Sequence, residues 1–233
     1  MSAVVTPLRT ALVAVLGVAG ISVGVVVVTN SDVFAENEYL QIIARDTGTT
    51  PAVKVAMVLG AYHESSFNVR LVPYVDRVGR GQPLTVCNGV TNAGMPKSFP
   101  PIDATRTYTL QECYRIERAL YTGYEASLPT YVVNYIDHTV WQQATYMDFI
   151  HHFGLGAFAT STMRKKANAG DAVGACLEHA KWKYTTLPNG AKTVLAGLEK
   201  RANSNAEVCG WDFEVYEQPQ AQVVFGDGFG DAA

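Results

Sequence analysis

An uncharged apolar run near the N-terminus constrains this chain more than any other feature. No charged side chain lies between Arg9 and Asp32, so the run Thr10–Ser31 comprises 22 residues. As an α-helix it would be about 33 Å long, enough to cross a hydrocarbon core of roughly 30 Å. Since Arg9 precedes the run and acidic residues follow it, the positive-inside bias predicts a cytoplasmic N-terminus with the remaining chain outside.

The composition of the run does not decide whether the segment stays in the membrane, is cleaved or is released. Small residues, among them Gly17, Gly20 and Gly24, interrupt it, and it contains neither Phe nor Trp. Such a helix gains less free energy on insertion than a Leu-rich helix does. Three outcomes remain: a permanent anchor, a signal peptide cleaved near Val33-Phe34-Ala35, and an anchor weak enough to leave the bilayer.

The overall composition excludes two broad classes of protein. Of 233 residues, 48% are hydrophobic and 17% are charged, the opposite of the imbalance that an intrinsically disordered chain shows. The net charge is −3, so the basic surface with which proteins grip nucleic acid is missing. We therefore expect one globular domain, a monomer, with no nucleic-acid partner.

Four cysteines follow the apolar run, on the side predicted to lie outside the cytoplasm. An even number in an oxidising compartment permits two disulfides in three connectivities, with four free buried thiols as the alternative. No C-x-x-C pair occurs, which argues against a zinc site. The cysteines are Cys87, Cys113, Cys176 and Cys209.

The order of local patterns predicts a small β lobe followed by a larger helical lobe. Residues 35–62 read as a polar linker and then a helix that begins around Thr49-Thr50-Pro51. Strand formers fill Val69–Thr91, and Thr109–Glu112 has the form of a capping box that opens a helix. Further helical patterns cover Tyr131–His138, Val140–Phe153, Ser161–Ala169, Asp171–His179 and Ala191–Glu207.

Two carboxylates and a hydroxyl near the β lobe are the candidate catalytic groups. Glu64 is the only carboxylate between Asp46 and Asp76, and Thr85 follows in the next predicted strand. Glycoside hydrolysis needs one carboxyl group that protonates the leaving oxygen and a second that orients or activates a water. A glutamate at a helix end facing an aspartate and a threonine on a hairpin has that form.

Several segments resemble lysozymes of glycoside hydrolase family 24. The hairpin segments Pro73–Gly79 and Leu84–Thr91 resemble the catalytic hairpin of phage lysozymes. Downstream, Phe153–Phe158, Ser161–Lys166, Asn168–Asp171 and Leu195–Cys209 are similar to the helical lobe of that family, in the same order. With the weak N-terminal span, the whole resembles a signal-anchor-release endolysin of a phage that infects a Gram-negative host.

This resemblance implies a lysozyme-like α+β fold, with a membrane-inserting helix before it. It divides the chain into a signal anchor (1–35), a catalytic domain (36–215) and a flexible tail (216–233). It implies a muramidase that cleaves the β-1,4 bond between N-acetylmuramic acid and N-acetylglucosamine in peptidoglycan. Glu64 would be the general acid, Asp76 and Thr85 would position the water, and no metal or organic cofactor would be needed.

The chain departs from the family pattern in two places. The family spaces its glutamate, aspartate and threonine by eight and five residues, whereas Glu64, Asp76 and Thr85 are separated by eleven and eight. Strict counting puts the glutamate position on Phe67, so the assignment of Glu64 requires two small insertions. The second departure is His152, where the family usually carries Asn.

The same departure keeps an alternative function open. A lysozyme scaffold that has lost its acid would be an inactive, membrane-tethered peptidoglycan-binding protein. In either case the resemblance places the protein in the inner membrane through residues 10–31, with its domain in the periplasm, and then free in the periplasm after release. The glycan strands of peptidoglycan would be its partner.

Overall fold

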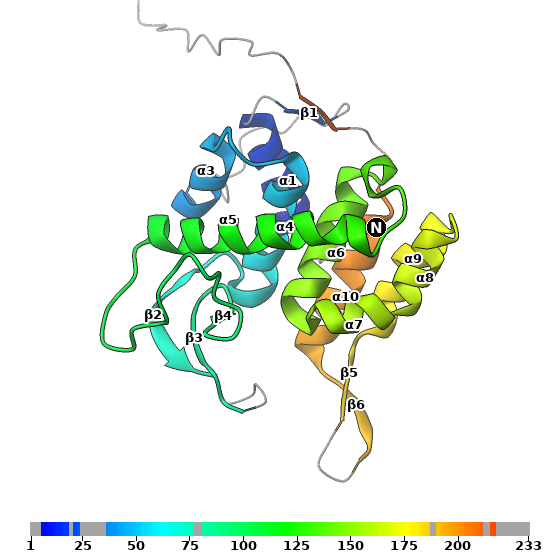
Figure 1. Ribbon diagram of the computed structural model, residues 1–233. Coiled ribbons are helices and arrows are strands. Elements are labelled where there is room, and N and C mark those ends of the chain that lie inside the picture. The colour runs from blue at the N-terminus through cyan, green and yellow to red at the C-terminus, as the bar shows by residue number, and fades with distance from the viewer. Residues whose placement is uncertain are drawn as a thin grey trace, which may run out of the picture.

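The expected two-lobed α+β organisation is present in the computed structural model, which describes residues 6–18, 21–23, 36–76, 81–186, 190–211 and 215–217. A small antiparallel sheet forms one lobe, and most of the helices form the other (Figure 1). The long helix α5 (Leu110–Ser127) runs along both lobes. It begins with the predicted capping box, in which the Thr109 and Glu112 side chains each accept from the other's backbone N–H.

The sheet of the β lobe consists of β2 (Arg70–Val75), β3 (Leu84–Cys87) and β4 (Val90–Thr91), in that spatial order. Tyr74 lies opposite Thr85 in the register, and Val86 opposite Val90. Val86 and Val90 are almost fully buried and pack against the face of α5 that carries Ile116 and Leu120. Burial of this apolar face attaches the sheet to α5.

Two helices form the centre of the helical lobe. α4 (Pro51–Ser65) begins at the predicted site, where the Thr50 side chain caps the helix and Pro51 occupies its first turn. Every residue of α4 from Ala52 to Tyr62 is buried, as expected for a helix that is apolar on all sides. It packs along α6 (Val140–Phe153).

The remaining elements correct three predictions. The pattern at Tyr131–His138 forms only a short 3₁₀ turn, and a hairpin strand occupies the start of the expected helix Ala191–Glu207. The region read as a linker contains the helix α3 (Glu38–Arg45), capped by Asn37. The other elements are η1 (Leu128–Thr130), η2 (Tyr135–Asp137), α7 (Leu155–Thr160), α8 (Thr162–Asn168), α9 (Ala172–Glu178), η3 (His179–Lys181), β5 (Tyr184–Thr186), β6 (Lys192–Val194) and α10 (Ala196–Cys209).

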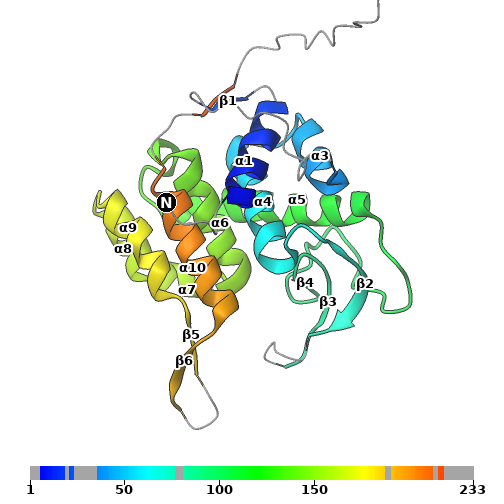
Figure 2. The same cartoon turned by 180° about the vertical axis from the view of Figure 1, so that it is seen from behind.

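The N-terminal run does not form the single 22-residue helix expected for Thr10–Ser31. Instead α1 covers Thr6–Val18, and β1 (Ile21–Val23) pairs with β7 (Val215–Glu217). Leu8, Leu12 and Leu16 recur at a spacing of four residues, and all three are fully buried. They place α1 against α3 and α4 (Figure 2). This apolar face of α1 is thus buried against protein.

No helix in the described part of the chain is both long and apolar enough to cross a membrane. The candidate cleavage site at Val33-Phe34-Ala35 lies outside the described residues, as does most of the proposed tail.

The four cysteines form two disulfides, one in each lobe. Cys87 of β3 is bonded to Cys113 of α5, and Cys176 of α9 is bonded to Cys209 of α10. The first ties the catalytic hairpin predicted above to the long helix. The second ties the last helix to the helical lobe.

Candidate active site

Glu64 lies in the last turn of α4, where the two lobes meet. Ser66 ends the helix in the left-handed conformation, with φ of 51°, and Phe67 then turns back into the core, where its ring packs on Tyr62. Of the two residues that compete for the glutamate position, Glu64 is therefore the one at the surface junction. The side chain of Phe67 belongs to the hydrophobic core.

Arg201 and His152 both contact the Glu64 carboxylate. The Arg201 guanidinium of α10 donates a hydrogen bond to Glu64 Oε1, and Nδ1 of His152 on α6 lies 3.5 Å from the same oxygen. Burial acts to raise the pKa of Glu64, but the His152 contact and the Arg201 charge, with His151 nearby, outweigh it and lower the pKa to about 2. The carboxylate is thus ionised in the free protein at neutral pH.

Behind Arg201 lies a buried polar network. Asp148 of α6 accepts hydrogen bonds from Arg201 and from Asn205, whose Nδ2 lies 2.6 Å from Oδ2 of Asp148. Burial acts to raise the pKa of Asp148, but the Arg201 charge and the contact with His63 outweigh it and lower the pKa. Asp148 therefore holds Arg201 in place as a buried counter-charge.

His63 completes this network on the side of α4. Its Nδ1 lies 3.2 Å from Asp148 Oδ2, and its Nε2 lies 2.6 Å from Ser204 Oγ. Although the order of atoms is that of a Ser-His-Asp triad, Ser204 is 1% exposed, so no substrate reaches its hydroxyl. His63 is a structural link between α4, α6 and α10.

Asp76 and Thr85 lie on the hairpin that faces Glu64. The Asp76 backbone N–H donates to the Pro83 carbonyl at 3.0 Å, and the Thr85 hydroxyl donates to the same carbonyl at 3.1 Å. Tyr74 pairs with Thr85 across the sheet. The pKa of Tyr74 is raised, first by burial and then by the charges of Glu64 and Asp76. Both carboxylates are therefore within electrostatic reach of this one phenol.

The turn between β3 and β4 brings its backbone against the carboxyl group of Glu64. A Cβ atom on Gly89, where φ is +82°, would lie 3.0 Å from Cδ of Glu64. Asn88, the preceding residue, is held by the buried Glu117 of α5, which accepts from its backbone N–H at 3.0 Å. Nε2 of His151 lies 2.9 Å from the Asn88 carbonyl oxygen. Glu117 and His151 thus fix the turn that contacts Glu64.

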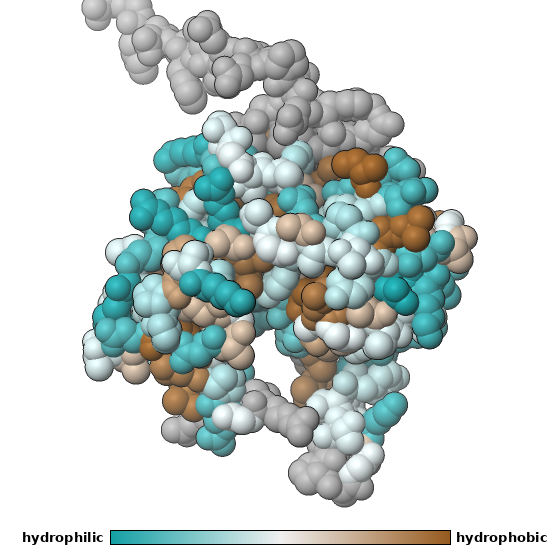
Figure 3. All heavy atoms as spheres, viewed as in Figure 1, coloured by the Kyte–Doolittle hydropathy of each residue, from teal (hydrophilic) through white to brown (hydrophobic). Residues whose placement is uncertain are grey.

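A hollow in the surface separates the two lobes beside this cluster. Figure 3 shows the surface receding between the β lobe and the β5–β6 hairpin. The elements that meet there are the end of α4, the β3–β4 turn and α10. This hollow is the cleft between the two lobes.

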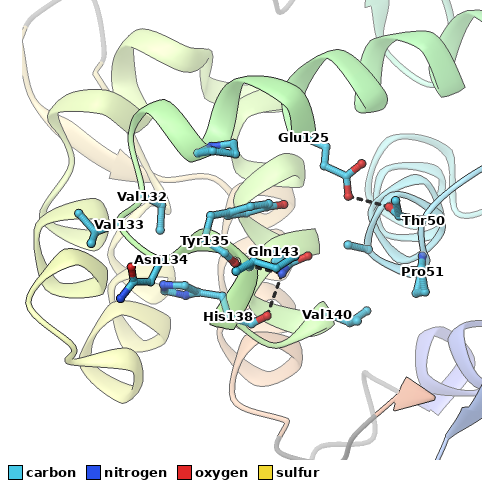
Figure 4. Close-up of a pocket in the computed structure, with 13 residues that line it drawn as sticks. Thr50, Pro51, Glu125, Val132, Val133, Asn134, Tyr135, His138, Val140 and Gln143 are labelled. Atoms are coloured by element: carbon cyan, nitrogen blue, oxygen red, sulfur yellow. Dashed lines mark hydrogen bonds between the residues drawn. The ribbon is translucent and has the colours of Figure 1, made fainter. Parts of the chain in front are cut away.

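A second cavity, of about 710 Å³, lies away from this cleft. It is formed at the other end of α4 by Thr50 and Pro51, together with Val132, Val133 and Tyr135, and its lining is mostly apolar (Figure 4). Its one carboxylate, Glu125, accepts a hydrogen bond from the Thr50 hydroxyl at 2.6 Å. A cavity with one engaged carboxylate lacks the pair that glycoside hydrolysis requires.

Sequence reasoning indicated Glu64, Asp76 and Thr85 as candidate catalytic groups, but it did not indicate the residues that set the charge of Glu64. Arg201 was part of a matched segment, and Asp148 and Asn205 were not singled out. One signal was available for Asp148 and Arg201. Both lie in patterns that predict buried helix faces, and a charged side chain is rarely buried without a partner of opposite charge. Their pairing over 53 residues of chain cannot be read from spacing.

Comparison with solved structures identifies the class of fold. An endolysin from Escherichia coli O157:H7 phage FAHEc1 superposes with a TM-score of 0.55 at 19% identity, covering 66% of this chain and 89% of the other. The active form of P1 phage endolysin Lyz superposes with a TM-score of 0.53 at 17% identity, covering 73% and 90%. The fold is that of the phage lysozymes.

Sequence comparison then identifies the family. The phage lysozyme family model matches residues 65–205. A SAR-endolysin of Bacteriophage PS119 is 30% identical over 171 residues, which cover 73% of this chain and 92% of the relative. A SAR-endolysin of Bacteriophage PS34 is 32% identical, with the same coverage. The chain belongs to the phage lysozyme family and is a glycoside hydrolase of that family.

Proposed function

We propose that this protein is an endolysin that hydrolyses the β-1,4 bond between N-acetylmuramic acid and N-acetylglucosamine in peptidoglycan to lyse the host cell. The observation that carries the proposal is the position of Glu64, at the lobe junction and facing the hairpin of Asp76 and Thr85. The family match supports the substrate class. The names of the relatives support the role in lysis.

In this mechanism Glu64 protonates the oxygen that leaves the anomeric carbon. Asp76 and Thr85 hold a water on the other side of the sugar, and the water attacks the same carbon as the glycosidic bond breaks. The proton that the water loses passes to Asp76. Thr85 is 3% exposed and its hydroxyl donates to the Pro83 carbonyl. Its role therefore requires that the water reach this buried hydroxyl oxygen, which can still accept a hydrogen bond.

The ionised state of Glu64 in the free protein sets a requirement on the substrate. A general acid must carry its proton when the bond breaks, whereas the contact with His152 and the charge of Arg201 favour the carboxylate. A glycan strand in the cleft removes water from Glu64, which raises the pKa of the carboxyl group. Substrate binding therefore increases the fraction of Glu64 that is protonated.

Burial of Phe67 removes the main support for the inactive alternative. That alternative rested on the strict spacing, which puts Phe67 in the glutamate position. Phe67 packs on Tyr62 in the core, while the Glu64 side chain is partly exposed at the junction of the lobes.

The enzyme assay that tests this function uses the full chain and a Glu64→Gln variant. Gln keeps the volume of Glu but cannot donate the proton, so we expect lysis of chloroform-treated Gram-negative cells to fall at least a hundredfold. Phe67→Ala is the matched control, which should lower stability and keep measurable turnover. Residual Glu64→Gln activity above about a hundredth of wild type would overturn the assignment.

We further propose that the protein is first tethered in the inner membrane by residues 10–31 and then released into the periplasm. The SAR-endolysin relatives support this, as does the low insertion energy of a Gly-rich run. Replacement of Gly17, Gly20 and Gly24 by Leu should retain the protein in the membrane fraction and delay lysis. A triple variant that reaches the periplasm at full length and at the normal time would rule out release as the control.

A further inference from the structure

The β5–β6 hairpin borders the cleft on the side opposite the β lobe. Its strands project from the helical lobe as a separate arm (Figure 1, Figure 2), and the surface hollow lies between this arm and the β lobe (Figure 3). Leu195 joins the arm to α10, the helix from which Arg201 reaches Glu64. The arm is thus a wall of the cleft to which the proposed mechanism gives no role.

One face of the arm carries an exposed aromatic ring. Tyr184 is 51% exposed, and no other Phe, Tyr or Trp side chain in the described part of the chain is as open to solvent. It lies opposite Val194 in the register, so the two side chains share a face of the hairpin, and Val194 is exposed as well. Neither residue belongs to the hydrophobic core. Exposed apolar surface beside a cleft is typical of a binding site.

A series of partly exposed rings connects the base of the arm to Glu64. Nδ1 of His152 lies 3.5 Å from Glu64 Oε1. The His152 ring packs on Phe153 with ring centroids 4.6 Å apart, and Phe153 packs on Trp182 with centroids 4.9 Å apart. Phe153 and Trp182 are only partly buried, and Trp182 lies two residues before Tyr184 in the chain. Aromatic side chains therefore continue from the carboxyl group to the arm.

Hydrogen-bonding groups lie beside the exposed ring. Nζ of Lys183 is 5.9 Å from the centroid of the Tyr184 ring and 3.2 Å from Oε1 of Glu199 on α10. Thr186 and Lys192, paired in the register, continue the exposed face along the hairpin. A sugar site needs an apolar surface for the C–H groups of the pyranose ring and a few polar groups for its hydroxyl and amide groups. The arm supplies both.

We propose that the face of the β5–β6 hairpin that carries Tyr184 is a second part of the glycan site, which binds an N-acetylated sugar of the strand away from the bond that is cleaved. The Tyr184 ring stacks on the pyranose, and Lys183 donates hydrogen bonds to its oxygens. Because the rings of Phe153 and Trp182 lie between Tyr184 and Glu64, the sugar on Tyr184 is not one of the two whose bond breaks. This inference rests on the proposed function for its substrate, peptidoglycan.

Loss of the ring should weaken the binding of peptidoglycan. Tyr184→Thr removes the ring but keeps a residue that favours strands. An aromatic stacking contact changes affinity by about three- to tenfold, so the dissociation constant for peptidoglycan should rise by about that factor. KM should rise similarly while kcat changes less, since Tyr184 does not touch the reacting carbon. Tyr184→Phe keeps the ring and should restore binding.

The experiment measures binding of the full-length protein to purified insoluble peptidoglycan by sedimentation. Glu64→Gln serves as the parent protein, so that the substrate is not consumed. Thr185→Ala, on the opposite face of β5, weakens strand pairing without removing the ring and is the matched control. Ile136→Ala is the second control, because Ile136 is 84% exposed and lies at the second cavity, away from the cleft. Both controls should bind like the parent.

The outcomes separate the inference from the proposed function. Weaker binding by Tyr184→Thr, with binding restored in Tyr184→Phe and retained in both controls, supports the inference. Parent-like binding by Tyr184→Thr overturns it, as does an equal loss in Tyr184→Phe or in either control. If the wild type neither binds nor hydrolyses peptidoglycan, the proposed function fails and this inference fails with it. If the wild type does both and the ring makes no difference to binding, only the inference fails.

Discussion

At the scale of single residues, the carboxyl group of Glu64 has two opposing requirements. The free protein favours its ionised form through Arg201 and His152, while the proposed role as general acid needs its protonated form. The ion pair links the end of α4 to α10, so it also contributes to stability. In the proposed mechanism the same contacts therefore oppose the first chemical step until substrate binds.

The first prediction at this scale compares Asp76 and Thr85, the two groups proposed to position the water. Asp76→Asn should reduce the rate more than Thr85→Val, because a carboxylate can accept the proton of the water and a hydroxyl only orients it. Initial rates on purified peptidoglycan, with circular dichroism to confirm folding, measure both. A folded Thr85→Val protein that is the slower of the two would contradict these roles.

The second prediction at this scale concerns how the free energy of unfolding depends on pH. The folded pKa of Glu64 is lowered from 4.5 to about 2, so its contribution is present above pH 4.5 and is lost as pH falls toward 2. At about 1.4 kcal/mol per pKa unit, the contribution is about 3 kcal/mol. Urea unfolding of wild type and Glu64→Gln should show a difference in stability that shrinks over this range. A difference that is constant with pH would mean that the ion pair does not stabilise the fold.

At the scale of elements, the sequence predicted helices well where a helix N-cap or a helical hydrophobic pattern marks them. Thr50 with Pro51, and Thr109 with Glu112, mark the starts of α4 and α5. α6 spans Val140–Phe153, the range that its sequence pattern predicted.

Predictions failed where tertiary contacts decide the structure. α3 was taken for linker because its buried residues Tyr39, Leu40 and Ile43 occupy only one face of a short polar helix. The strand β6 was taken for the start of α10. For the site, the sequence indicated Glu64, Asp76 and Thr85, but the distant partners that set the charge of Glu64 required the fold.

The prediction at the scale of elements concerns the turn between β3 and β4. Gly89→Ala should reduce activity at least tenfold, because the added Cβ would meet the Glu64 carboxyl group at 3.0 Å. Gly170→Ala is the matched control, since Gly170 has a similar φ of +78° and a Cβ added there would meet nothing within 4 Å. Each substitution should cost about 1 kcal/mol of stability through backbone strain. Equal activity in the two variants would show that the turn does not support the acid.

At the scale of the whole molecule, α1 is an integral part of the hydrophobic core. Leu8, Leu12 and Leu16 are fully buried in the same cluster as residues of α4 and α6. The folded protein thus uses for its own packing part of a sequence run that would also suit a bilayer. Both uses depend on the same removal of apolar surface from water.

The prediction at this scale is that Leu12→Ala lowers the free energy of unfolding by about 2–4 kcal/mol, as in other buried Leu→Ala replacements. Val133→Ala is the control, because Val133 is 59% exposed and should change stability by less than about 0.5 kcal/mol. Urea unfolding of the full chain measures both. An unchanged midpoint for Leu12→Ala would mean that α1 does not unfold with the rest of the domain.

The two disulfides enclose residues 87–113 and 176–209, and α1 lies outside both loops. The only covalent link between the helix and the domain is therefore the chain itself, and its packing on α3 and α4 can be treated as the binding of a tethered ligand. The effective concentration of such a ligand is set by the length of its tether. Dilution of the protein does not change that concentration, and reductants do not act on the tether itself. Occupancy of the α1 site is consequently the same in a very dilute solution as in a concentrated one.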